Sequence, residues 1–173
     1  GQHNFLKINK TLKVSTIKEI TSLLETLAPK AYAEDFDNVG LLVGNPETEI
    51  TGILVCHDAL ENVIDEAISK KCNLVVCFHP ILFSSLKKIT GKNYVEKAIL
   101  KAIKNDIAIY AAHTNMDNIL QGVNRMIADK LGLVNLKILA PKAGLLRKLV
   151  VFCPLEHASL VREALFAAGE IGR

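Results

Sequence analysis

Three of the five histidines follow apolar, strand-like runs. His57 follows GILVC, His79 follows NLVVCF, and His113 follows IAIYAA. In an open α/β sheet, ligands bind beyond the carboxyl ends of the strands, where the loops converge. If these strands are neighbours, the three imidazoles meet at one edge of the sheet. Carboxylates accompany them, because Asp58 adjoins the first histidine and Asp117 follows the third within HTNMDN.

Neutral imidazole and carboxylate are the usual ligands for zinc, manganese or iron. A metal bound by them polarises a phosphoryl or carbonyl oxygen, or lowers the pKa of a bound water to about 7. His79 is the strongest candidate ligand, because Pro80 and the apolar ILF fix its turn and a buried imidazole needs a partner. Asp117 is the next candidate, with a helix cap as the alternative role. These two residues alone are too few for a closed tetrahedral zinc site.

Other residues and chemistries have weaker signatures. No serine nucleophile elbow, no P-loop and no GxGxxG after a strand is present. Asp37 and Asn38 precede a glycine in DFDNVGLLVG, which is an ordinary turn signal. Taken singly, His57 and His113 are also compatible with structural or surface roles. The two other histidines, His3 and His157, are interpreted as bystanders.

The elements that must position these residues alternate between helices and strands. Apolar spacing predicts helices over 14–29, 59–71, 94–106 and 122–133, and strands over 39–44, 49–58, 73–78 and 107–112. This alternation implies right-handed crossovers, so the predicted class is α/β with a largely parallel sheet flanked by helices. After a loop near residue 140, a strand over 149–154 and a helix over 156–169 are expected. They are either one more βα unit of the sheet or the start of a second domain.

Composition narrows the class of protein. The chain has 173 residues, half of them hydrophobic, which is enough for one well-packed domain. The formal net charge is only +3 and no basic block stands out, so nucleic acid is an unlikely partner. The four cysteines show no CxxC pairing, which indicates free thiols in a reducing compartment. No secretory signal and no run of roughly 20 apolar residues is found, so a cytoplasmic protein without a membrane span is expected.

Four separated motifs resemble a known family. They are FDNVGLLVG (36–44), FHPILFSSLKKIT (78–90), AIYAAHTNMDN (108–118) and GVNRMIADKLGL (122–133). In order and spacing they closely resemble the GTP cyclohydrolase I type 2 homologues, also called the NIF-three-like family of dinuclear-metal proteins. The resemblance covers the chain from about residue 14 to residue 170.

The resemblance implies an overall organisation. Members of this family have an α/β fold with two divalent metals in a cleft, a hexameric toroid assembly, and often an inserted ferredoxin-like domain similar to the PII and CutA proteins. The segment 148–169 looks like the first βα unit of that insert. We therefore expect an N-terminal arm at 1–13, an α/β metal-site domain at 14–140, and an incomplete inserted domain at 146–173.

The resemblance also implies a ligand set. In the family, ligands come from a His-His-Pro motif, from the aspartate of HTN.D, and from a histidine and a glutamate near the C-terminus. Carried over, His79 and Asp117 are metal ligands, and His113 lines the site as a group for proton transfer. Phe78 stands where the first histidine of the pair is expected, and His57 is the candidate replacement. The C-terminal ligands have no match here, so we expect half a site, weak affinity for divalent metal, and self-association through exposed apolar surface.

The leading hypothesis is therefore the N-terminal part of a metal-dependent, hydrolase-like protein that acts on a nucleotide or phosphoester-type substrate. Up to two zinc, manganese or iron ions per subunit of the full-length protein are expected. The alternative is a non-catalytic oligomeric scaffold or regulatory adaptor that binds metal structurally, which Phe78 favours. A third possibility is an α/β domain that binds a small molecule without metal. Expected partners are other copies of the chain, by resemblance a hexamer, and a small-molecule substrate.

Overall fold

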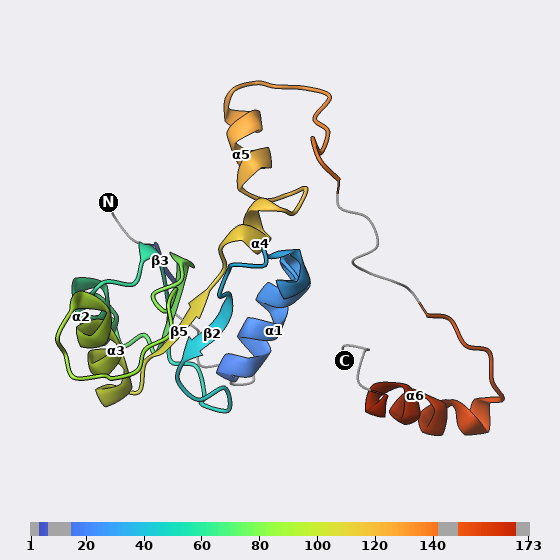
Figure 1. The fold of residues 1–173 in the computed structure, drawn as a ribbon, viewed down its shortest axis with the longest axis horizontal. Helices are drawn as coiled ribbons and strands as arrows, with labels where there is room; N and C mark the ends of the chain where they lie inside the picture. Colours follow the sequence, from blue (N-terminus) through green and yellow to red (C-terminus); the bar gives the residue numbers. More distant parts are fainter. Residues whose placement is uncertain (1–3, 7–14, 142–148, 169–173) are drawn as a thin grey trace. The chain divides into compact units, whose positions relative to one another are not determined.

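The computed structural model describes residues 4–6, 15–141 and 149–168. The chain divides into two compact units, Gly1–Ile138 and Leu139–Arg173. The first unit is built on a five-stranded sheet of order β1-β3-β4-β5-β2 (Figure 1). None of the described helices has the length and apolar character that a membrane span requires.

The sheet is mixed. Its strands are β1 (Asn4–Leu6), β2 (Gly40–Val43), β3 (Ile53–Asp58), β4 (Leu74–His79) and β5 (Ala108–Ala111). β3, β4 and β5 pair in parallel, whereas β1 pairs antiparallel with β3 and β2 pairs antiparallel with β5. The predicted α/β class is confirmed, but only the three central strands are parallel. Alternation of helices and strands does not encode the direction of an edge strand, and antiparallel edges on a parallel sheet are common.

Two helices of the first unit, α1 (Ile17–Leu27) and α3 (Tyr94–Lys104), begin at capping side chains. The other described helices of this unit are α2 (Glu61–Ser69), α4 (Thr114–Asp117) and α5 (Val123–Lys130), with a 3-10 turn η1 (Lys30–Tyr32). At α1, Thr16 and Glu19 form a capping box, which satisfies two backbone N–H groups reciprocally. At α3, the Asn93 side chain accepts a hydrogen bond from the Glu96 N–H. Both caps are local, so they fix helix starts that the sequence alone indicates.

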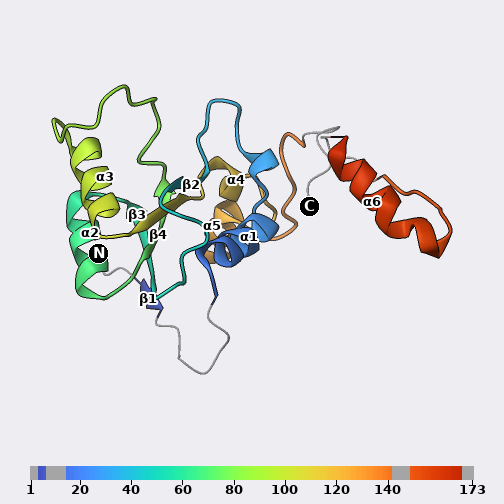
Figure 2. The same cartoon turned by 90° about the horizontal axis from the view of Figure 1, so that it is seen from below.

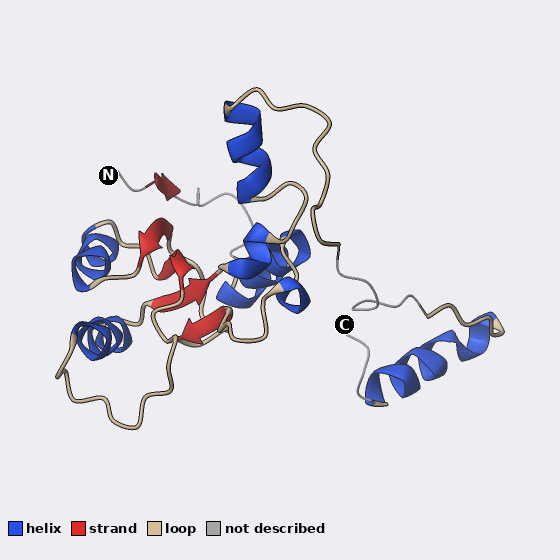
Figure 3. Cartoon of the chain, turned by 45° about the horizontal axis from the view of Figure 1, so that its top comes forward, coloured by secondary structure: helices blue, strands red, loops and turns tan. Residues whose placement is uncertain are grey.

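Helices cover both faces of the central strands, as Figures 2 and 3 show: α2 and α3 lie on one face and α1 on the other. Side chains of β4 alternate between two cores. Val75 and Cys77 pack with α2 and α3, whereas Leu74 and Val76 pack on the α1 side. Strands buried on both faces are apolar throughout, so their polar residues are confined to the ends.

The connection between β4 and α3 is held by a nearly buried carboxylate. Glu96 is 7% exposed and accepts hydrogen bonds from Thr90 N (2.8 Å), Thr90 Oγ1 (3.0 Å) and Lys92 N (2.9 Å). The backbone bonds from Lys92 and Thr90 are the main reason that its pKa is lowered. The loop that follows His79 is therefore tied to the start of α3.

The second unit contains η2 (Leu155–His157) and α6 (Ala158–Ala167). The helix expected over 156–169 is confirmed for its described part. The strand expected over 149–154 is wrong, because these residues are irregular. No strand of the described ranges pairs with them, and an isolated strand leaves its backbone groups without a ladder. Residues 146–148 lie outside the described part, and the ferredoxin-like insert stays a prediction.

Candidate metal centre

The strand register places a carboxylate beside an imidazole. In the parallel pairing of β3 with β4, Cys56 is the partner of Cys77 and Asp58 is the partner of His79. Both strands end at this pair. His57 precedes Asp58, so two histidines and one aspartate gather at the carboxyl edge of the sheet.

Asp58 hydrogen-bonds to both histidines. Its Oδ1 lies 2.7 Å from His79 Nδ1, and its Oδ2 lies 3.2 Å from His57 Nδ1. The hydrogen bond from His79 is the main cause of a lowered pKa for the Asp58 carboxyl, which is therefore charged at neutral pH. The side chains are 69% (His57), 48% (Asp58) and 46% (His79) exposed, so solvent and ions reach the cluster.

The cluster fits a divalent transition metal. One ligand atom from each of His57, Asp58 and His79 lies within 4.8 Å of the others. Two imidazole nitrogens and a carboxylate oxygen are a ligand set that zinc, manganese and iron accept. Three protein ligands leave coordination positions open, as in catalytic rather than structural zinc sites. Cys56 and Cys77 are buried in the core that contains α2 and α3 and are not part of this cluster.

The third histidine lies against the same cluster. The His113 ring is 5.4 Å from the His79 ring and 5.1 Å from the Phe78 ring, between centroids. Phe78 stacks on His57 at 5.5 Å with an interplanar angle of 15°. The structure therefore brings together the three histidines that end or follow the central strands, with Phe78 packed among them.

Sequence reasoning missed Asp37, which it treated as a turn residue. The Asp37 side chain is fully buried, and its Oδ1 lies 2.9 Å from His113 Nδ1. Its Oδ2 accepts hydrogen bonds from the backbone N–H (3.0 Å) and the hydroxyl of Thr114. The signal that could have identified Asp37 is its position in the first family motif. A DN pair before a glycine says nothing about a partner 76 residues away.

Asn115 completes this support. It is fully buried, its Oδ1 accepts from the His113 N–H (2.9 Å), and its Nδ2 donates to the Ala28 carbonyl (2.8 Å). The turn between β5 and α4 is thereby tied to the end of α1. His113 is thus held through its backbone as well as through its ring.

Asp117 does not belong to the group formed by His57, Asp58 and His79. It ends α4, is partly exposed, and its backbone carbonyl accepts a hydrogen bond from Asn124 Nδ2 (3.0 Å). In the described part of the chain, the group of side chains able to hold a metal contains His57, Asp58 and His79 but not Asp117. The role of Asp117 as a ligand stays a prediction.

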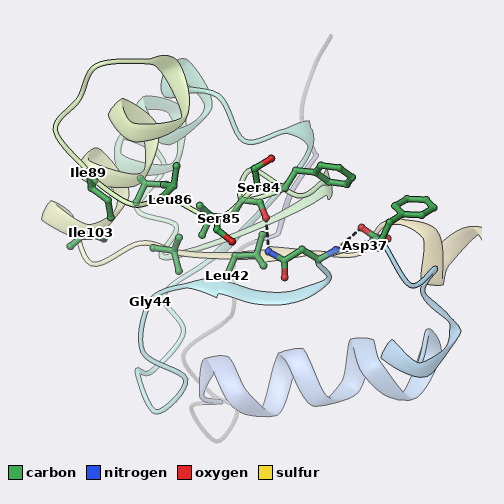
Figure 4. Close-up of a pocket in the computed structure, with 14 residues that line it drawn as sticks. Asp37, Leu42, Gly44, Ser84, Ser85, Leu86, Ile89 and Ile103 are labelled. Carbon is green, nitrogen blue, oxygen red and sulfur yellow. Dashed lines mark hydrogen bonds between the residues drawn. The ribbon is translucent and has the colours of Figure 1, made fainter.

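Two pockets border the loop after β4. The smaller, of about 360 Å³, includes Asp58 and His79 in its wall together with Leu60, Phe83 and Tyr94. The larger, of about 670 Å³, lies between β2 and α3. Figure 4 shows Asp37 at one end of the larger pocket and Ile89 and Ile103 at the other. Only the smaller pocket is lined by the candidate metal ligands.

We expect Asp37→Asn to lower the free energy of unfolding by about 2 kcal/mol at neutral pH, because charged hydrogen bonds are lost. Burial alone raises the pKa of Asp37, but hydrogen bonds from Thr114, His113 and Asn38 outweigh it, so the pKa lies below its ordinary value of 3.8. The carboxylate therefore stabilises the fold above that pH, and the stabilisation is lost as the pH falls through the lowered pKa. Urea unfolding of both proteins between neutral pH and pH about 3 measures this.

The difference between the Asp37 variant and the parent is expected to shrink towards the acid end of that range. Asp35→Asn is the matched control, because its carboxylate is exposed on the same loop. A difference for Asp37 that stays constant with pH would contradict the expectation.

Comparison with known proteins gives consistent findings. Residues 15–168 match the model of the family described as Duf34/NIF3 (NGG1p interacting factor 3). The GTP cyclohydrolase 1 type 2 homolog of Bacillus subtilis is 43% identical over 153 residues, which cover 88% of this chain and 41% of the relative. The homolog of Clostridium acetobutylicum is 43% identical over 124 residues, which cover 72% of this chain and 46% of the relative. The chain thus spans less than half the length of these relatives.

Solved structures share the fold. The Bacillus cereus protein related to NIF3 has a TM-score of 0.72 at 38% identity, over 94% of this chain and 46% of that one. Reduced HcgD from Methanocaldococcus jannaschii has a TM-score of 0.66 at 33% identity, over 72% of this chain and 50% of that one.

Proposed function

The chain belongs to the Duf34/NIF3 family, and from this premise we propose that it is the N-terminal part of a divalent-metal-dependent, GTP cyclohydrolase 1 type 2-like hydrolase. The observation that carries the proposal is the His57, Asp58 and His79 cluster, whose ligand atoms lie within 4.8 Å of one another. The names of the relatives supply the comparison with GTP cyclohydrolase. Because the chain covers 41% of the Bacillus subtilis relative, the activity of the whole protein is part of the proposal.

In this proposal, His57, Asp58 and His79 hold one zinc, manganese or iron ion. His57 supplies the second imidazole that Phe78 does not, since its ring lies 4.4 Å from the His79 ring. Asp117 serves a second ion, with the remaining ligands outside this sequence. A divalent metal supplies Lewis-acid chemistry, which polarises a substrate oxygen and makes a hydrolytic water more acidic.

His113 takes up or releases a proton beside the metal ligands. Its side chain is 18% exposed, which is far less than the side chains of His57 and His79. General acid–base groups need a position within reach of the reacting group and a defined orientation. The contacts to His79 and Phe78 provide the first of these requirements.

The substrate binds in the pocket of about 360 Å³ that Asp58 and His79 border. Tyr94 and Phe83 offer aromatic surface, and Ser84 and Asn93 offer hydrogen bonds. A nucleotide fits this combination of aromatic and polar groups beside a metal that binds phosphate oxygens. We propose a nucleotide or a related phosphoester as the substrate class.

The second candidate function is a non-catalytic scaffold or regulatory adaptor that binds metal structurally. Phe78 favours it, because one imidazole of the family motif is missing. Exposed apolar side chains on and after α5 support self-association; these are Met126, Ile127, Leu131, Leu133 and Val134. The proposal of a hexamer comes from the resemblance. A small-molecule domain without metal is the least favoured, since the clustered ligands would then have no role. The four free cysteines agree with a cytoplasmic location, which is also a proposal.

Hydrolysis assays on the metal-loaded full-length protein, which supplies the remaining ligands, separate the two functions. We expect the Asp117→Ala variant to lose at least about tenfold in the rate of nucleotide hydrolysis while keeping its sedimentation coefficient, because a ligand acts on chemistry. His157→Ala is the control, since His157 lies in the second unit. Loss of assembly without any metal-dependent hydrolysis in the parent would favour the scaffold instead.

A further inference from the structure

The Asp37 carboxylate is surrounded by hydrogen-bond donors. Oδ2 accepts from the Thr114 N–H and hydroxyl, and Oδ1 accepts from the Asn38 N–H at 2.8 Å and faces His113 Nδ1 at 2.9 Å. Its side chain is fully buried. A carboxylate with no exposed oxygen and every neighbour donating is not available as a metal ligand.

The contact with His113 determines which ring nitrogen carries the proton. An ionised carboxylate only accepts hydrogen bonds, so the nitrogen that faces it must be Nδ1–H. In neutral imidazole the other nitrogen, Nε2, then keeps its lone pair. Among the described residues, His113 Nε2 has no hydrogen-bond partner. The lone pair is therefore available on the side of the ring away from Asp37.

We propose that Asp37 is a positioning residue that holds His113 as the Nδ1–H tautomer, with Nε2 as a proton acceptor beside the candidate metal ligands. What Nε2 does there rests on the proposed function, whereas the tautomer does not. Asp37 is buried, whereas the Asp58 side chain is 48% exposed and contacts both His57 and His79. The two aspartates therefore have separate roles: Asp37 orients the His113 ring, and Asp58 is a candidate metal ligand.

The Asp37→Asn variant tests this assignment. An amide has one oxygen for the donors that two carboxylate oxygens satisfied. Thr114 offers two donors on one side, whereas on the side of His113 the Asn38 N–H is the one backbone donor among the described residues, so the oxygen is expected to face Thr114. When that oxygen faces Thr114, the amide nitrogen faces His113 and donates to Nδ1, which moves the ring proton to Nε2. We expect the Nε2–H tautomer to become the major form of His113.

Long-range proton–nitrogen NMR on the metal-free 173-residue chain, labelled with nitrogen-15 histidine, reads the tautomer directly. At about pH 8.5, above the ordinary titration range of imidazole, the parent should show a protonated Nδ1 and an unprotonated Nε2 for His113. In Asp37→Asn the Nε2 resonance should move to the range of a protonated nitrogen. An Nε2–H parent, or a variant that keeps Nδ1–H as its major form, would overturn the proposal.

Two control variants separate positioning from structural support. Thr114→Val removes a hydroxyl that donates to Asp37, so it should lower stability without changing the His113 tautomer. Asp58→Asn alters the metal cluster and should also leave that tautomer unchanged. If the Asp37→Asn variant does not fold and gives no dispersed NMR spectrum, the His113 tautomer of the parent still tests the proposal. Since no metal or substrate is present, a failed metal-binding or hydrolysis assay would leave this result intact.

Discussion

The His79→Ala variant is expected to bind divalent metal at least about a hundredfold more weakly than the parent chain. Even the loss of a group that only orients a ligand lowers metal affinity by about 10–100-fold. His79 is held 2.7 Å from Asp58 and its ring lies 4.4 Å from the His57 ring. Removing its imidazole leaves two ligands, which is fewer than structural or catalytic zinc sites use. Asp58→Ala is expected to have the same effect, because its carboxylate contacts both histidines.

Metal content by plasma mass spectrometry, on protein purified without chelators, measures this loss. His157→Ala is the matched histidine control, since it lies in the second unit. Asp117→Ala distinguishes two ligand sets. If the variant retains metal, the ligands are His57, Asp58 and His79; if it loses metal, Asp117 is also a ligand. Full retention of metal in His79→Ala would contradict the assignment of the centre.

Replacement of Asn115 by leucine is expected to lower the free energy of unfolding by about 4 kcal/mol, because two buried backbone groups lose their partners at about 1–3 kcal/mol each. These groups are the His113 N–H and the Ala28 carbonyl. Leucine has a similar shape but offers neither a donor nor an acceptor. The loss is a large part of the stability of a typical domain, and urea unfolding followed by circular dichroism measures it.

Asn118→Leu is the control for this prediction. Asn118 also donates from its amide to a backbone carbonyl, that of Tyr32 at 2.8 Å, but it is exposed. Water replaces its partners, so the expected loss is about 1 kcal/mol or less. Equal losses in the two variants would show that burial of Asn115 is not what makes its amide important.

Much of the first unit could be predicted because its signals are local. The spacing of apolar residues placed α1, α2 and α3. Continuous apolar runs indicated central strands buried on both faces. The strand expected over 149–154 failed for the complementary reason, since an apolar run becomes a strand only when another strand pairs with it.

Sequence alone determined that His57, His79 and His113 stand at the ends of apolar strands and that the chain resembles the family it belongs to. Both follow from residue order, because a strand that leaves a double-sided core turns polar where it ends. Tertiary structure alone decided that the register of β3 and β4 pairs Asp58 with His79, and that the buried Asp37 side chain contacts the His113 ring. Register and long-range contact are fixed by how side chains of distant segments pack together, and residue spacing along one segment carries no record of them.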